Sequence, residues 1–136
     1  MARRVPSAKH PMPAIAPGAA LRTFFNIAKA WALSEQQTMA LLGFDVSTRS
    51  TYFKWKKDPD SARLGRDKLE RLSYVFGIYK ALQLLLPNPS AADGWLQRPN
   101  SAAPFGGRPV LERLLSGNVA DLYVVREYLD SARGWS

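Results

Sequence analysis

Apolar residues recur at helical spacing along most of this chain, and no run alternates convincingly between apolar and polar residues as a strand would. Proline and glycine interrupt these apolar stripes at short intervals, which indicates several helices joined by tight connections. The sequence therefore predicts an all-α fold. Its 136 residues suffice for one domain, or for two small domains that share a core.

The first three helices are predicted from an apolar stripe, caps and breakers. The stripe of the first helix consists of Leu21, Phe24, Phe25, Ala28 and Trp31. Ser34 and Gln37 form a plausible capping box for the second helix, which should end at Gly43 in the left-handed conformation. We expect Ser47 to cap the third helix, and the Asp58–Pro59 pair to end it near residue 57.

The longest helix is predicted over residues 66–86. Towards its end it is apolar nearly all round, which is typical of a buried helix. Prolines at positions 87 and 89 end it, and further helices are expected over residues 90–96, over 109–116 and from Asn118, which should cap the last one. A tight turn over residues 105–108 separates these short helices.

Positive charge is concentrated in the first part of the chain. Residues 1–80 hold 14 of the 19 basic and 6 of the 11 acidic residues, a net charge of +8, whereas residues 81–136 are neutral. This asymmetry indicates an anionic partner for the first part, although a basic surface that only confers solubility is the alternative. The first 17 residues are rich in proline and carry Arg3, Arg4 and Lys9, so we interpret them as a flexible basic arm.

Composition and motifs argue against catalysis, a cofactor or a metal. The chain has no cysteine, and its single histidine, His10, lies in the proline-rich arm away from any carboxylate in a structured segment. The turn over residues 105–108 lacks the ending of a phosphate-binding loop. No apolar stretch is long enough to span a membrane, and the basic start runs into prolines instead of a signal core, so we expect a cytoplasmic protein.

Two short helices around a glycine turn match the helix-turn-helix pattern, which places its second helix in the major groove of double-stranded DNA. Arg49, in the first turn, is the best candidate for a bidentate contact with guanine. The candidate DNA-binding residues are Ser47, Thr48, Arg49, Ser50, Thr51, Lys54 and Lys57. Tyr52 and Trp55 should instead pack inward, against Trp31 and Leu42. The alternative is a three-helix core with a solvated basic face.

The second part of the chain resembles a known family. Residues 95–100, 104–112, 114–117 and 125–134 follow in order the pattern of the C-terminal domain of Xre/MbcA/ParS antitoxins. Residues 31–34, 41–43 and Trp55 resemble the degenerate helix-turn-helix of the same family, so that the similarity covers about residues 20–136. The resemblance implies an antitoxin that binds and inhibits a RES-type toxin, which destroys NAD, and that binds its own operator as a dimer or in a toxin–antitoxin complex.

The resemblance also implies where each partner binds. The family's inhibitory tail corresponds here to Arg133, Gly134, Trp135 and Ser136, and Trp135 suits insertion into a cleft because buried tryptophan dominates many interfaces. Packing of Trp135 on its own domain is the alternative. We divide the chain into the arm 1–17, a helix-turn-helix domain 18–62 and a toxin-binding domain 63–136. A stand-alone regulator, with a C-terminal domain for dimerisation or a small ligand, is the competing function.

Overall fold

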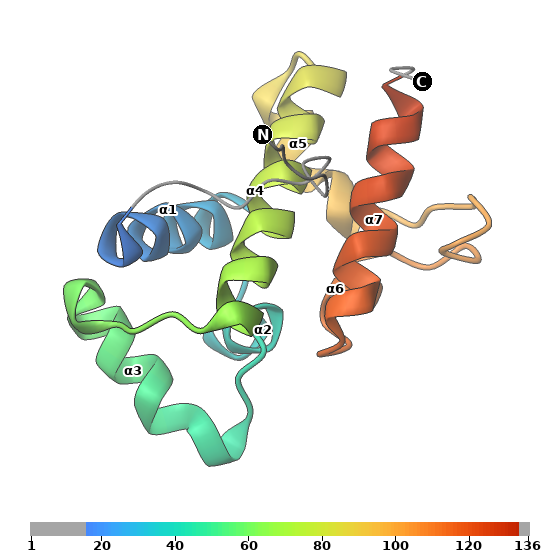
Figure 1. Ribbon diagram of the computed structural model, residues 1–136. Helices are drawn as coiled ribbons and strands as arrows, with labels where there is room; N and C mark the ends of the chain where they lie inside the picture. The colour runs from blue at the N-terminus through green and yellow to red at the C-terminus, as the bar shows by residue number, and fades with distance from the viewer. Residues whose placement is uncertain (1–15, 134–136) are drawn as a thin grey trace, which may run out of the picture.

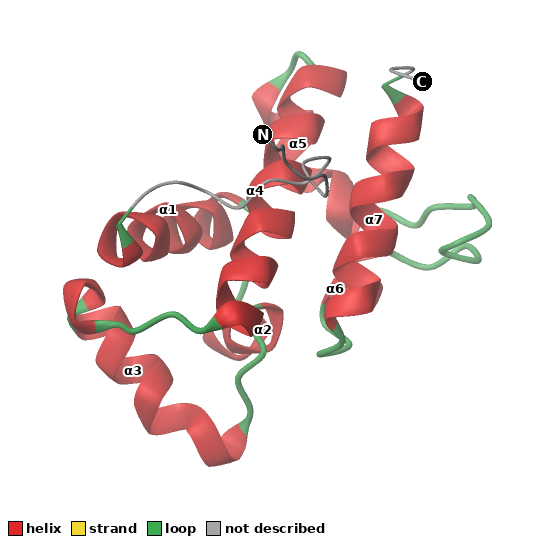
Figure 2. Ribbon diagram, in the orientation of Figure 1, coloured by secondary structure: helices red, strands yellow, loops and turns green. Residues whose placement is uncertain are grey.

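The computed structural model describes residues 16–133, and all regular structure in this range is helical apart from one isolated bridge between Pro99 and Pro109 (Figures 1 and 2). The first elements are α1 Pro17–Ala30, α2 Glu35–Leu41, the 3-10 turn η2 Val46–Thr48, α3 Arg49–Lys57 and the 3-10 turn η3 Pro59–Ser61. They are followed by α4 Arg66–Leu85, α5 Pro89–Gly94, η4 Trp95–Gln97, α6 Val110–Leu114 and α7 Val119–Ala132. The prediction of an all-α fold is confirmed.

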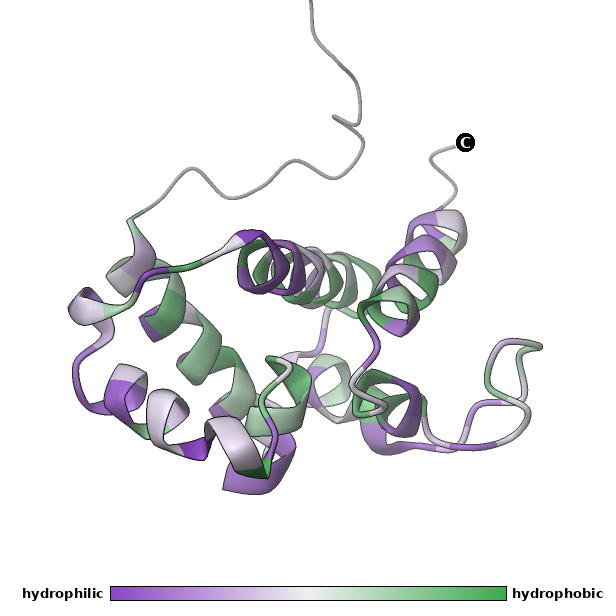
Figure 3. Cartoon of the chain, turned by 60° about the horizontal axis from the view of Figure 1, so that its bottom comes forward, coloured by the Kyte–Doolittle hydropathy of each residue, from purple (hydrophilic) through white to green (hydrophobic). Residues whose placement is uncertain are grey.

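Helix α4 lies at the centre of the molecule, with α1 and α3 on one side, α2 at its lower end in this view and α7 alongside it on the other side (Figure 1). Its fully buried apolar residues are Leu72, Val75, Ile78, Ala81 and Leu82. They belong to one continuous core that extends from Leu21 in α1 to Leu129 in α7. Figure 3 shows the hydrophobic sides of the helices turned toward one another and the hydrophilic sides turned outward. The helix-turn-helix and the C-terminal helices therefore share a single core.

Two local signals in the sequence are confirmed. The Ser34 hydroxyl accepts a hydrogen bond from the amide of Gln37 at 3.1 Å, and the Gln37 side chain accepts one from the amide of Ser34 at 2.9 Å. This reciprocal capping box fixes the start of α2. Gly43, just after α2, has a φ of +81°, the left-handed conformation that a residue with a Cβ adopts at a cost.

The expected cap at Ser47 is wrong. Asp45 caps instead, because its carboxylate accepts from the amide of Thr48 at 3.2 Å while the Thr48 hydroxyl accepts from the amide of Asp45 at 2.9 Å. This second capping box starts η2, and α3 begins only at Arg49. The Ser47 hydroxyl donates to the Asp45 carboxylate at 2.6 Å. A carboxylate is the stronger acceptor, so it takes the capping role.

Other boundaries differ in detail. The segment predicted as one helix over 90–96 divides into α5 and η4, Pro109 is the N-cap of α6 and not its first residue, and α6 ends at Leu114. Asn118 occupies the N-cap position of α7, but its side chain makes no capping hydrogen bond. At the end of α4, Leu84 is 57% exposed, so one side of this helix stays open. The predicted arm lies outside the described residues except for its last two, of which Pro17 begins α1.

Candidate functional site

The outer side of α3 carries most of the residues predicted to contact DNA. Ser50, Thr51, Lys54 and Lys57 are exposed there. Neither lysine forms an ion pair with any residue between 16 and 133, so both ammonium groups are available to an anionic partner. Arg49 is also exposed, and its guanidinium lies 4.8 Å from the centre of the Phe53 ring, which restrains the side chain along the helix.

Ser47 and Thr48 belong to η2 rather than to α3, and their hydroxyl groups are engaged within the turn. Both contact the Asp45 carboxylate, which lowers the pKa of Asp45 below its ordinary value through the hydrogen bonds from Ser47 and then Thr48. The structure thus brings five of the seven predicted residues together on α3, and assigns the other two to the turn that precedes it.

The inner side of α3 holds the helix against the rest of the domain. Tyr52 and Trp55 are buried, as expected, and their rings pack edge-to-face against Phe44 at centroid distances of 5.5 and 5.3 Å. Trp31, which we expected as their partner, has its ring against Tyr79 of α4 at 6.2 Å instead. Phe44 lies in the connection after Gly43, so this connection supplies the aromatic anchor for α3.

Glu35, the first residue of α2, ties this helix to α3. Its carboxylate accepts hydrogen bonds from the Lys56 ammonium and from the Tyr52 hydroxyl. These two contacts, Lys56 first, lower the pKa of Glu35, whereas burial and then the neighbouring carboxylate raise the pKa of Tyr52. Lys56 is thereby neutralised, which leaves Arg49, Lys54 and Lys57 as the cations of α3 without a carboxylate partner among the described residues. Sequence spacing gave no signal for this pair, because its members are 21 residues apart.

A second aromatic group organises the C-terminal helices. The ring of Trp95 stacks on Tyr128 of α7 at 6.3 Å, and Phe105 packs edge-to-face on the same ring at 5.2 Å. The Arg113 side chain of α6 donates to the carboxylate of Asp121 at 2.8 Å and to the carbonyl of Pro104 at 2.8 Å. The structural role predicted for Trp95 is confirmed, since these contacts join η4, the 105–108 turn and α7.

The end of α7 contains a buried charged group. Asp130 is 4% exposed, and its two carboxylate oxygens accept from Nε of Arg126 at 3.2 and 3.1 Å. The Arg126 guanidinium lies directly over Gly77 of α4, where a Cβ would approach its nearest nitrogen to 1.3 Å. Arg133, the last described residue, pairs with the same carboxylate at 3.8 Å. Gly134, Trp135 and Ser136 of the predicted tail lie outside the described residues.

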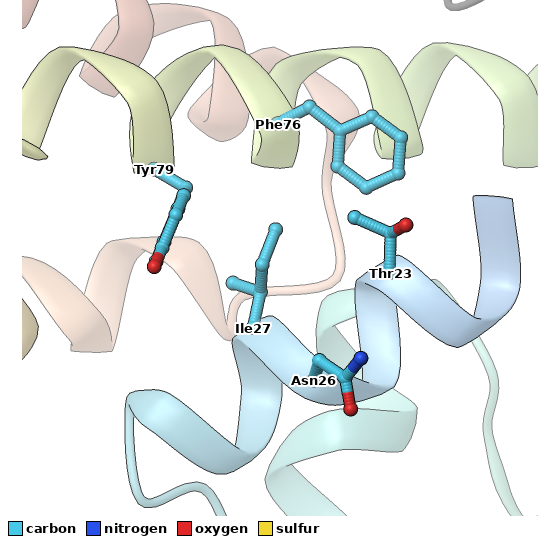
Figure 4. Close-up of a pocket in the computed structure, with 5 residues that line it drawn as sticks. All are labelled: Thr23, Asn26, Ile27, Phe76 and Tyr79. Atoms are coloured by element: carbon cyan, nitrogen blue, oxygen red, sulfur yellow. The ribbon is translucent and has the colours of Figure 1, made fainter. Parts of the chain in front are cut away.

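Two hollows of moderate size lie along α4. The one between α1 and α4, of about 290 Å³, is lined by Thr23, Asn26, Ile27, Phe76 and Tyr79, and Figure 4 shows Phe76 and Tyr79 of α4 facing Thr23 and Ile27 of α1 across it. It contains no carboxylate, imidazole, amine or thiol with which to begin catalysis. The other, of about 200 Å³, is apolar and lies beside the end of α7; we call it the α7-end groove, lined by Leu82, Leu85, Leu86, Trp95, Tyr128, Leu129 and Ala132.

Comparisons with known proteins match both parts of this arrangement. A family model for the antitoxin Xre-like helix-turn-helix domain matches residues 10–77, and one for the antitoxin Xre/MbcA/ParS C-terminal toxin-binding domain matches residues 81–134. The chain belongs to the Xre-type antitoxin family. The antitoxin is also 45% identical over 116 residues to the uncharacterized protein y4oB of Sinorhizobium fredii, and this alignment covers 85% of each chain.

The family resemblance expected from the sequence is confirmed, and it assigns a class of partner to each part of the antitoxin. Its helix-turn-helix domain contains α1, α2 and α3, and the candidate DNA-contacting residues lie on the exposed side of that domain. Its toxin-binding domain contains α5, α6 and α7. Among residues 16–133 no group of three or more acidic or histidine side chains is placed to hold a metal ion. No helix in the same range is long and apolar enough to cross a membrane.

Proposed function

We propose that this antitoxin neutralises a RES-type toxin that degrades NAD, and that it represses its own operon through α3. The observation that carries the proposal is the presence, in one chain, of an antitoxin helix-turn-helix domain and a toxin-binding domain. The RES type is the partner implied by the resemblance of residues 95–134. Both domains act by binding, and so we propose no catalytic step for the antitoxin itself. We also propose that it acts in the cytoplasm, where its operator and its toxin are found.

For toxin inhibition we propose that residues 133–136 enter the active site of the toxin. The apolar side of α7, with Leu122, Val125 and Leu129, is already buried in the core, so the residues that follow this helix are not needed to complete it. Gly134 gives the backbone freedom to turn. Trp135 offers a large apolar surface with one N–H donor, and the Arg133 guanidinium would pair with an acidic group of the kind that holds the ribose of NAD.

For operon repression we propose that α3 lies in the major groove. Ser50, Thr51, Lys54 and Lys57 share its exposed side, where the lysines would contact phosphates, and Arg49 would read guanine. Ser47 and Thr48 in η2 lie at the entrance of this helix, close enough in sequence to contact the same stretch of DNA. A homodimer would place two such helices on the two halves of a palindromic operator. The contact between Lys56 of α3 and Glu35 of α2 fixes the position of α3 relative to α2, and a helix that reads bases in the major groove must be held in such a fixed position.

The competing function is a stand-alone regulator whose C-terminal part binds a small ligand. The α7-end groove is the observation that favours it, because an apolar hollow of about 200 Å³ is available there. Its lining contains no ion pair or charged group to orient a ligand, which is unusual for a specific small-molecule site. We therefore prefer the toxin-binding function.

Co-expression with the product of the neighbouring gene tests the proposal. The partner alone should stop growth and deplete cellular NAD, and the antitoxin should restore both and co-purify with the partner. A variant with Lys54→Ala and Lys57→Ala should still rescue growth and lose operator binding, because these exposed lysines lie on α3 and not on the toxin-binding domain. If NAD stays depleted in the presence of the intact antitoxin, or if no complex forms, the proposed toxin partner is wrong.

A further inference from the structure

Val46 is 88% exposed, the highest value among the large hydrophobic residues that are exposed in the described part of the chain, compared with 57% for Leu84 and 43% for Tyr123. It is the first residue of η2, between the two helices of the helix-turn-helix. An exposed valine in isolation requires no explanation. This valine is distinguished by its position at the entrance to the recognition helix and by the rigidity of the turn that carries it.

The turn holds the Val46 side chain outward. On one side of Val46 is Asp45, whose carboxylate and amide close the capping box with Thr48. Before Asp45 comes Phe44, which is buried against Tyr52 and Trp55 and has the Lys68 ammonium 4.5 Å from its ring centre. With Phe44 fixed inward and the next turn closed by hydrogen bonds, the Val46 side chain cannot fold back into the core.

The surroundings of Val46 identify the kind of surface that would cover it. η2 leads directly into α3, so that Val46 lies three residues before Arg49, the first residue of that helix. Figure 1 shows this start of α3 at the lower corner of the molecule, on the far side from α5 and from the end of α7. Arg49, Lys54 and Lys57 of this helix form no ion pair with a carboxylate among residues 16–133. An apolar side chain at the start of such a cationic helix complements DNA better than it complements a hydrophobic protein surface.

We propose that Val46 is a specificity-determining residue of this antitoxin, and that it contacts the 5-methyl group of a thymine in the operator. The inference rests on the proposed DNA-binding function and extends it to a residue and a base. The thymine methyl is the apolar group that bases present in the major groove, and small apolar side chains at the start of a recognition helix are within reach of it. The contact removes both the exposed valine and the methyl group from water.

Replacement of single thymines by deoxyuridine, which lacks only the methyl group, tests the contact directly. The full-length protein is titrated against duplexes of the DNA upstream of its own gene, in which each thymine of the protected region is replaced in turn. At one thymine of each half-site, replacement should weaken wild-type binding about four-fold, the value of one buried methylene-sized group. Val46→Ala removes this contact at both half-sites of the dimer, so it should bind the unmodified duplex about sixteen-fold more weakly than wild type, and should not respond to the same replacement.

Two variants serve as controls. Leu84→Ala removes the other strongly exposed aliphatic side chain and should bind DNA like wild type, because it lies at the opposite end of α4 from the helix-turn-helix. Val46→Thr keeps one methyl group, and its sensitivity to deoxyuridine should fall between that of wild type and that of Val46→Ala. Because Val46 is so exposed, Val46→Ala and Val46→Thr should both leave the melting temperature of the protein unchanged.

Unchanged affinity of Val46→Ala for the operator overturns the inference. So does a weaker affinity that is equally sensitive to every deoxyuridine replacement, since the loss is then not tied to a methyl group. Loss of toxin inhibition with intact operator binding would assign Val46 to the toxin interface and overturn it as well. If the wild-type protein itself has no preference for the upstream DNA, the proposed repressor function fails together with this inference, which distinguishes that failure from a failure of the Val46 contact alone.

Discussion

Replacement of Gly43 by alanine should destabilise the antitoxin by more than its backbone conformation alone explains. Gly43 ends α2 with a φ of +81°. A Cβ at this position would lie 2.6 Å from Nε and 2.7 Å from Cζ of Arg71, well inside contact distance. The Arg71 side chain is 10% exposed, and so it has little room to move away.

The size of the expected destabilisation follows from the hydrogen bonds that Arg71 would lose on moving away from the new Cβ. Its Nε donates to both carboxylate oxygens of Asp67, at 3.1 and 2.9 Å, and its terminal nitrogen donates to the carbonyl of Gly117 at 2.9 Å. Displacing a charged group from such hydrogen bonds costs about 1.5–3 kcal/mol. The left-handed backbone adds about 1–2 kcal/mol for a residue with a Cβ. The expected loss is therefore about 2.5–5 kcal/mol, a large part of the stability of an ordinary domain.

Gly106 provides a matched control. It also has a positive φ, of +56°, but a Cβ there would have nothing within 4 Å. Gly106→Ala should consequently lose only the backbone part, about 1–2 kcal/mol. The free energies of unfolding are measured by urea titration, followed by circular dichroism and tryptophan fluorescence. The difference between the two variants isolates the collision with Arg71.

A double-mutant cycle completes the test. In an Arg71→Ala background the collision is absent, so Gly43→Ala should then cost no more than Gly106→Ala does. Equal losses for the two glycine variants in the wild-type background would refute the reasoning. An excess loss at Gly43 that persists without the Arg71 side chain would also refute it, because the cause would then lie in the turn itself.

Three further predictions concern the two interfaces and acid stability. Arg49→Ala should weaken operator binding by about 1–3 kcal/mol and relax the preference at one base pair, whereas Lys57→Ala should weaken binding to all sequences alike, as gel-shift titrations on matched and mutated duplexes would show. Removal of residues 133–136 should abolish inhibition of NAD hydrolysis by the toxin; full inhibition by the shortened protein contradicts the tail proposal, and a large fall in melting temperature would indicate packing on its own domain. The hydrogen bond from Lys56 holds the pKa of Glu35 below its ordinary value of 4.5. The ionised Glu35 carboxylate therefore stabilises the fold above pH 4.5, and this stabilisation is lost as the pH falls through the lowered pKa. Glu35→Gln should reduce the free energy of unfolding near neutral pH and change it little in strong acid, as urea titrations at the two pH values would show.

Much of the fold could be predicted because its signals are local. The Ser34–Gln37 capping box and the glycine that ends α2 are short patterns with a direct backbone consequence, and both are confirmed. The inward side of α3 was also predictable, since Tyr52 and Trp55 are three residues apart on a helix whose other residues, apart from Phe53, are polar or charged. The preference of helix N-caps for serine favours Ser47, whereas the structure shows that Asp45 and Thr48 form the capping box.

The long-range contacts could not be predicted from the sequence. Periodicity identifies which side of a helix is buried, but not which other helix covers it. The Arg71 contact with Gly117 joins residues 46 positions apart, and the contact of Lys56 with Glu35 joins residues 21 apart. For the same reason the sequence did not reveal which α3 cations remain free of a carboxylate partner. This distinction required the position of Glu35 beside α3.

The two binding domains of this antitoxin share α4 and are not joined by a linker. The match to the helix-turn-helix domain ends at residue 77, and the match to the toxin-binding domain begins at residue 81; both positions lie within α4. Its buried residues face α1 on one side and α7 on the other, and Arg71 contacts both the loop before α7 and, by close approach, the Gly43 turn. A fragment that ends after α4 would expose the surface that α7 covers, and would lose the stability that this packing supplies. DNA binding and toxin binding should therefore be separated by substitutions of exposed residues in the full chain, because truncation after α4 would unfold the part that it is meant to isolate.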